Sequence, residues 1–235
     1  MGSLDASFRS DPGLASQLLT AANSAIYGFR AHISTIRHAL TVLGLERAHS
    51  LIATLATSSY LRQFPAALVR PIWSHAVATA VIAEQLAKYA NGASGSATYT
   101  AGLTHDLGRL GLLASARNTY ASFLLDEFED RQESELREWE MFGVIHTVAG
   151  ALLTQSWGFP ESLCGHAENH HVESEFATEE EQIVHSACLL ADAMGYPELR
   201  LRSDHEQSAM VQSHGRYVDA NCRQTVEQRI REFLP

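Results

Sequence analysis

Helical periodicity runs through almost the whole sequence, and it constrains the fold more than any other feature. Apolar residues recur three or four positions apart, and no segment sustains the alternation of apolar and polar residues that a half-buried strand would show. The stretch from Ser34 onwards, for example, places Ile36, Leu40 and Leu43 on one helical face, and Gly44 is a typical residue for ending such a helix. The pattern predicts an all-α protein built as a helical bundle.

Two helical subregions are expected within this bundle. Residues 1–65 form an N-terminal helical subregion, which begins with a predicted helix from Asp11 and is closed by Pro65. Residues 66–235 form a second helical domain, which contains a predicted helix over 118–130 and ends in an amphipathic C-terminal helix. We expect the first subregion to pack on the second.

The charge balance argues against nucleic acid as a partner. The chain has 17 Lys and Arg against 27 Asp and Glu, a formal net charge of −10, and no dense run of basic residues, whereas nucleic-acid binding depends on clustered cations. No stretch approaches the roughly 20 apolar residues of a membrane span, and the N-terminus lacks a secretion signal. The three cysteines are far apart and odd in number, which argues against a disulfide framework. We expect a soluble cytoplasmic protein.

A set of histidines and aspartates interrupts the apolar helical stripes. The adjacent pair His105–Asp106 lies in the almost wholly apolar run 99–113, where burying both side chains without a partner would cost free energy. Imidazole nitrogens and carboxylate oxygens are ligands of Fe, Mn, Co and Zn. Neighbouring residues on a helix point about 100° apart, so Asp106 could bridge two ions while His105 binds one. We predict an interior site for one or two divalent ions, formed by His75, His105, Asp106, His146, His170, His171 and Asp192.

Each of these residues also has a purely structural interpretation. His75 could be a hydrogen-bonded core histidine, His146 could be exposed, and one member of the pair His170–His171 could face solvent. Asp192 lies near a predicted helix end, where a carboxylate is unfavourable unless a cation accompanies it. Two further histidines could substitute as ligands: His166 and His185.

Several blocks of the sequence, in the same order, resemble the HDOD family, a branch of the HD superfamily with an extra N-terminal helical region. The blocks are DPGLASQLLTAANSAIYG, ISTIRHALTVLGLERAHSLI, IWSHAVATAVIAEQLA, AGLTHDLGRLGL and HTVAGALLTQSWGFPESL. The resemblance covers residues 8–195, and it implies the HD pattern of His75, His105–Asp106 and Asp192. It also implies a signalling role in bacteria, and an N-terminal region that is short or truncated before Asp11.

The related HD-GYP family consists of metal-dependent phosphodiesterases that open cyclic di-GMP, and this likeness implies a ligand set of all seven residues. Three departures count against turnover. Arg109 stands where those enzymes have a lysine that contacts phosphate, and Pro71 replaces a glutamate one turn before His75. The HH pair is followed by VESEFATEE instead of the glycine-rich GYP segment. The letters GYP at 195–197 follow another helix, which they are predicted to end.

Two functions follow from these observations. The favoured one is a regulatory domain that acts on a signalling protein partner through protein–protein contacts, with a metal-binding pocket but no catalytic turnover. The alternative is a metal-dependent phosphohydrolase acting on cyclic di-GMP or another phosphate ester. In that alternative a metal-bound hydroxide attacks phosphorus, Asp106 bridges the ions and Arg109 stabilises the phosphoryl oxygens. Arg109 could instead be a surface arginine. A weaker third hypothesis is a partner groove that includes residues 23–30.

Overall fold

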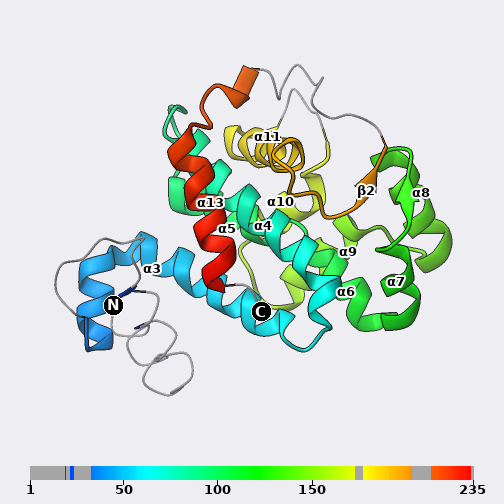
Figure 1. Ribbon diagram of the computed structural model, residues 1–235, viewed down its shortest axis with the longest axis horizontal. Coiled ribbons are helices and arrows are strands. Elements are labelled where there is room, and N and C mark those ends of the chain that lie inside the picture. The colour runs from blue at the N-terminus through cyan, green and yellow to red at the C-terminus, as the bar shows by residue number, and fades with distance from the viewer. Residues whose placement is uncertain (1–18, 20–21, 24–32, 173–176, 203–212, 234–235) are drawn as a thin grey trace.

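The computed structural model describes residues 19, 22–23, 33–172, 177–202 and 213–233. The described part is mostly helical, which confirms the predicted all-α class (Figure 1). Two short strands, β1 (Glu127–Phe128) and β2 (Arg200–Leu201), pair in parallel. The helices are α3 (Ile36–Leu61), α4 (Ala66–Ala87), α5 (Gly95–Thr104), α6 (Leu107–Ser115), α7 (Arg117–Phe123), α8 (Arg131–Phe142), α9 (His146–Ser156), α10 (Glu161–Asn169), α11 (Glu179–Ala193) and α13 (Ala220–Phe233).

Helix α4 forms the centre of the core and packs against α5, α11 and α13. Figure 1 shows it in the middle of the bundle, with these helices around it. Contrary to the expectation from sequence, α4 is long and apolar enough to cross a membrane by length and composition. However, 67% of its apolar window is buried inside the protein, as in a core helix. Trp73 and Val77 on this helix are completely buried.

Helix α3 is interrupted at Gly44, the residue at which the sequence predicts a helix to stop. Gly44 has φ 76° and ψ 164°, a conformation that L side chains rarely adopt. A Cβ added at Gly44 would have no other atom within 4 Å. The first part of α3 extends away from the bundle in Figure 1, while the second part packs against α5. Helix α3 ends at Leu61 and α4 begins at Ala66; the division into units 1–65 and 66–235 stays a prediction.

Three sequence-based expectations need comment. The helix predicted over 118–130 is wrong in its second half, because α7 ends at Phe123 and the chain then turns into β1. Phe128 in β1 is completely buried, its ring centroid 4.8 Å from that of Phe123, and its carbonyl accepts a bond from the backbone of Arg202. Asp130 then caps a new helix by accepting from Glu133 N. The helix predicted from Asp11 and the stretch 24–30 lie outside the described residues.

Helices α6 and α9 approach each other closely where two glycines face one another. A Cβ added to Gly108 would lie 2.6 Å from the backbone N of Gly150 and closer still to the carbonyl oxygen of His146. No side chain fits at position 108 unless the helices separate. This packing fixes the start of α9, and therefore His146, against the segment that carries His105 and Asp106.

Candidate metal centre

The seven residues singled out in the sequence all lie around one buried centre, in the space between six helices. They reach it from the middle of α4, the α5–α6 junction, the first turn of α9, the residues after α10 and the last turn of α11. Ring and ion-pair contacts link them into one group. These residues are His75, His105, Asp106, His146, His170, His171 and Asp192. Their role as metal ligands stays a prediction.

The pair His105–Asp106 lies between two helices, and the expectation that it lies within one helix is wrong. His105 caps the C-terminus of α5, and Asp106, with φ −108° and ψ 21°, precedes α6. The Asp106 side chain makes no capping bond to the backbone of α6, but its carbonyl accepts a backbone bond from Arg109 N. The two side chains are 1% and 3% exposed. The prediction of a buried polar pair therefore agrees with the structure, although its local geometry differs.

The five imidazoles each make the same kind of hydrogen bond through Nδ1. In each ring Nδ1 faces only carbonyl or carboxylate oxygens, which accept but do not donate, so Nδ1 must carry the proton. The acceptors are Tyr196 O for His75 at 2.9 Å, Gly102 O for His105 at 2.6 Å, Glu138 Oε2 for His146 at 2.6 Å, Ala167 O for His170 at 2.9 Å and Glu135 Oε1 for His171 at 2.7 Å. Such Nδ1–H bonds are the usual outer partners of metal-binding histidines, which then bind through Nε2.

Two of the Nε2 atoms are buried without a hydrogen-bond partner, namely those of His105 and His170. Burial and the nearby charge on His75 lower the pKa of His105 to about 3, and burial together with its histidine neighbours lowers the pKa of His170. Both rings are therefore neutral and present lone pairs. A buried lone pair without a donor is costly, and a cation would satisfy it.

His75 lies beside two carboxylates and an arginine. Its Nδ1 is 3.1 Å from both Asp192 Oδ1 and Glu198 Oε2. Arg131 holds the other oxygens of these carboxylates, with Nη2 2.8 Å from Asp192 Oδ2 and Nη1 2.9 Å from Glu198 Oε1. Burial lowers the pKa of His75, but Glu198, Cys188 and Asp192 outweigh it and raise that pKa well above its ordinary value. Asp192 thus has the cation that its place near a helix end requires.

Arg109 is completely buried, so the interpretation as a surface arginine is wrong. Arg109 is the third residue of α6, and every nitrogen of its guanidinium has a hydrogen-bond partner. Nε donates to Asp106 Oδ2 at 2.8 Å, Nη1 to Glu138 Oε1 at 3.0 Å and Nη2 to His146 Nε2 at 3.4 Å. Burial raises the pKa of Asp106, and Arg109 opposes this shift. Arg109, with all its guanidinium nitrogens bonded, therefore acts as a buried cation within the centre.

Four residues at the centre were not found from the sequence: Arg131, Glu138, Cys188 and Glu198. Glu138 is completely buried and binds both the ring and the backbone N–H of His146. Burial opposes its ionisation, yet His146 and Arg109 lower the pKa of Glu138 to about 2. Ser134 and Glu138, four residues apart on α8, are both buried. His166 and His185, the two alternative ligands, make other contacts: His166 Nε2 is 3.9 Å from Glu180 Oε2, and His185 Nδ1 donates to His170 O.

The donor atoms of this centre fit a divalent ion. Within the described residues, three groups place their donor atoms within 4.8 Å of one another, and two of these groups share His75. The groups are His75 with His105 and Cys188, His146 with His170 and His171, and His75 with Asp192 and Glu198. Imidazole nitrogens and carboxylate oxygens are ligands of Fe, Mn, Co and Zn. The buried histidine clusters of this chain could therefore hold metal.

The cavity beside Asp106 is small. A cavity that touches Asp106 measures about 10 Å³, room for roughly one water molecule. An apolar pocket of about 460 Å³ lies next to it, lined by Thr104, Leu107, Trp157 and Leu163 among others, and none of the seven residues lines this pocket.

Comparison with known proteins gives a family and a fold. The model of the HDOD domain family matches residues 1–173. Similar solved structures include an HDOD domain protein of unknown function from Geobacter sulfurreducens, with a TM-score of 0.67 and 20% identity over 97% of this chain and 80% of that one. A protein from Shewanella amazonensis SB2B, provisionally described as a phosphohydrolase, has a TM-score of 0.71 and 21% identity over 99% and 85% of the two chains.

A third similar structure is the MmoQ response regulator from Methylococcus capsulatus, with a TM-score of 0.52 and 19% identity over 89% of this chain and 82% of that one. At these identities the likeness shows a shared fold. A comparison with curated protein sequences finds no significant match. The family match covers most of the sequence, including His75, the His105–Asp106 pair and the His170–His171 pair. The chain belongs to the HDOD domain family.

Proposed function

We propose that this HDOD domain is a bacterial, cytoplasmic regulatory module that acts through protein–protein contacts, holds a divalent ion in its buried centre and does not turn over a substrate. One observation carries this proposal. Two arginines, Arg109 and Arg131, already neutralise the carboxylates that a hydrolytic dinuclear site would use. A hydrolase needs an open metal position for water and substrate.

Arg131 opposes turnover more directly than Arg109 does. Its Nη1 donates to His171 Nε2 at 2.6 Å, so the guanidinium lies among three groups that a second metal ion would need. Those groups are the ring of His171 and the carboxylates of Asp192 and Glu198. A fixed positive charge at this position favours a centre with at most one ion.

Helix α8 offers a route from the centre to a partner. It carries Arg131 and Glu138 on its inner side, while Leu136 and Trp139 on the same helix are 58% and 62% exposed. Large apolar side chains exposed together indicate an interaction surface. A change at the centre that moved Arg131 would move this surface with it. The proposal therefore assigns partner contact to the outer face of α8.

The second candidate is a metal-dependent phosphohydrolase, and a specific observation favours it. Asp106 Oδ1 is buried without a hydrogen-bond partner and lies 3.7 Å from His146 Nε2. An unpaired carboxylate oxygen between imidazoles is suited to a metal ion, and a metal-bound hydroxide is the nucleophile that this chemistry requires. The likeness to a protein provisionally described as a phosphohydrolase is consistent with this candidate.

One experiment separates the two candidates. The protein is purified anaerobically, its Fe, Mn, Co and Zn content is measured, and hydrolysis of bis-(p-nitrophenyl) phosphate and cyclic di-GMP is assayed beside the Asp106→Ala variant. Near-stoichiometric metal without hydrolysis supports the regulatory proposal. Hydrolysis that disappears in Asp106→Ala would replace it with the phosphohydrolase. Protein that neither retains nor takes up metal would refute metal binding in both.

A further inference from the structure

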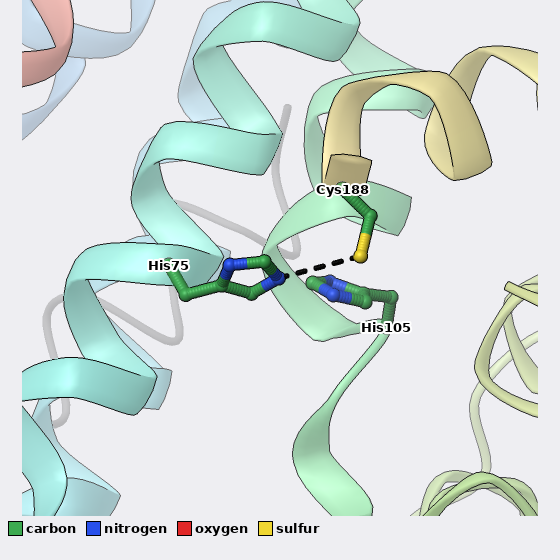
Figure 2. Close-up of side chains that lie close together, drawn as sticks. All are labelled: His75, His105 and Cys188. Atoms are coloured by element: carbon green, nitrogen blue, oxygen red, sulfur yellow. Dashed lines mark hydrogen bonds between the residues drawn. The ribbon is translucent and has the colours of Figure 1, made fainter. Parts of the chain in front are cut away.

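Cys188 contacts the centre, although it is not one of the residues that the HD pattern would contribute. It lies on α11, one turn before Asp192, and is 1% exposed. Its Sγ is 3.5 Å from His75 Nε2. Figure 2 shows the thiol directed into the space between the rings of His75 and His105, and the donor atoms of these three residues lie within 4.8 Å of one another.

The histidines beside Cys188 are prepared to bind an ion. His105 Nε2 is buried without a partner, while its Nδ1 donates to Gly102 O. His75 Nδ1 faces Tyr196 O and two carboxylates, which leaves its Nε2 directed at the sulfur. Both rings therefore have their outer nitrogen fixed and their inner nitrogen directed at the same space, the arrangement found around bound metals.

The distance between sulfur and nitrogen matches that of two ligands on one ion. With a Zn–S bond of about 2.3 Å and a Zn–N bond of about 2.0–2.1 Å at a tetrahedral angle, the two donor atoms are about 3.5 Å apart. The observed separation of Sγ and Nε2 is 3.5 Å. A thiol that only donates a hydrogen bond to His75 would also fit this distance, but it would leave His105 Nε2 without a partner.

We propose that Cys188 is a thiolate ligand that binds one divalent ion together with His75 and His105. This inference rests on the proposed metal binding and is independent of whether the protein turns over a substrate. Sulfur ligands favour thiophilic ions, so the site takes Zn²⁺, Co²⁺ or Fe²⁺ in preference to Mn²⁺ or Mg²⁺. The thiol proton of Cys188 and the Nε2 proton of His75 leave as the bonds to the metal form, so binding releases protons.

Cobalt provides a direct test, because a Co²⁺–thiolate bond gives an intense near-ultraviolet charge-transfer band that nitrogen and oxygen ligands do not give. The full chain is stripped with a chelator and titrated with Co²⁺ alone. We expect this band to appear together with the visible d–d bands, and to remain in the Cys164→Ser/Cys222→Ser double variant, in which Cys188 is the sole cysteine. In Cys188→Ser the band should disappear, and Co²⁺ affinity should fall by at least about 10-fold.

The outcomes separate this inference from the proposed function. Visible d–d bands without the charge-transfer band would refute thiolate ligation by Cys188 and leave metal binding in place. The absence of all cobalt bands would refute both. A charge-transfer band that is lost in the double variant would assign the sulfur to Cys164 or Cys222 and overturn the inference. Because this last comparison leaves Cys188 unchanged, it decides the question even if Cys188→Ser does not fold.

Discussion

The contact between α6 and α9 gives a sharp test of how the centre is held together. Replacing Gly108 by Ala places a Cβ 2.6 Å from Gly150 N and 2.8 Å from the carbonyl carbon of His146. Ordinary contacts begin at 3.4 Å and the carbonyl oxygen of His146 is closer still, so the helices must separate by more than about 1 Å. These obstacles are backbone atoms, and no change of rotamer can relieve them. Overpacking costs about 1–3 kcal/mol, and we expect the upper end here.

The matched control is Gly111→Ala, one turn further along the same helix. A Cβ there would lie 3.5 Å from Leu153 Cδ2, an ordinary contact. With space available, the change from Gly to Ala in a helix stabilises by about 0.5–1 kcal/mol. The two variants therefore make the same chemical change on the same helix, and only the available space differs.

The assay is thermal unfolding followed by circular dichroism. At about 2–4 °C per kcal/mol for a chain of this size, Gly108→Ala should lower Tm by about 6–12 °C, and Gly111→Ala should leave Tm unchanged or raise it. Gly108→Ala should also weaken Co²⁺ binding, because the start of α9 carries His146. A Tm for Gly108→Ala at or above that of the wild type would refute the close approach of the two helices.

Three further variants test the charges. Arg131→Met leaves its two buried carboxylate partners without their cation and should destabilise the metal-free protein by about 3–5 kcal/mol, measured as a fall in Tm. Glu138→Gln weakens the acceptor that orients His146, and competition with a chromophoric chelator should show roughly 10–100-fold weaker metal binding. Burial raises the pKa of Cys222 from 9.0 to about 11. The stability that this thiol contributes is complete below pH 9 and lost as pH rises to 11, so the Tm difference between wild type and Cys222→Ala should change across that interval.

Local patterns in the sequence predict the fold class and one part of the centre. Apolar periodicity predicts the all-α class, and a histidine or aspartate that interrupts an apolar stripe is visible because burial without a partner is costly. His105–Asp106 is the clearest case. The helix that carries the pair was predicted to continue to Gly108, because the run 99–113 keeps helical periodicity through the pair. Only the observed backbone of Asp106 shows that one helix ends and another begins there.

The charged partners of the centre could not be predicted, because their local sequence is typical of solvent-exposed residues. Arg131 and Glu138 occur in the highly charged segment 131–142, where charges normally face solvent. Glu198 follows the end of α11 in a short loop. Their burial depends on where α8 and this loop pack, which is a tertiary property. Cys188 is typical of a core residue by composition, and only its position beside His75 distinguishes it.

The order in which the ligands occur along the chain has a consequence for assembly. The contact between His75 and Cys188 spans 113 residues, and that between His75 and Tyr196 spans 121. Long sequence separations of this kind slow the formation of native contacts. During synthesis, an ion could meet the complete donor set only after residue 198 has left the ribosome. A fragment that stops at residue 173, where the family match ends, would contain all five imidazoles but would lack the thiol and the acidic groups opposite His75.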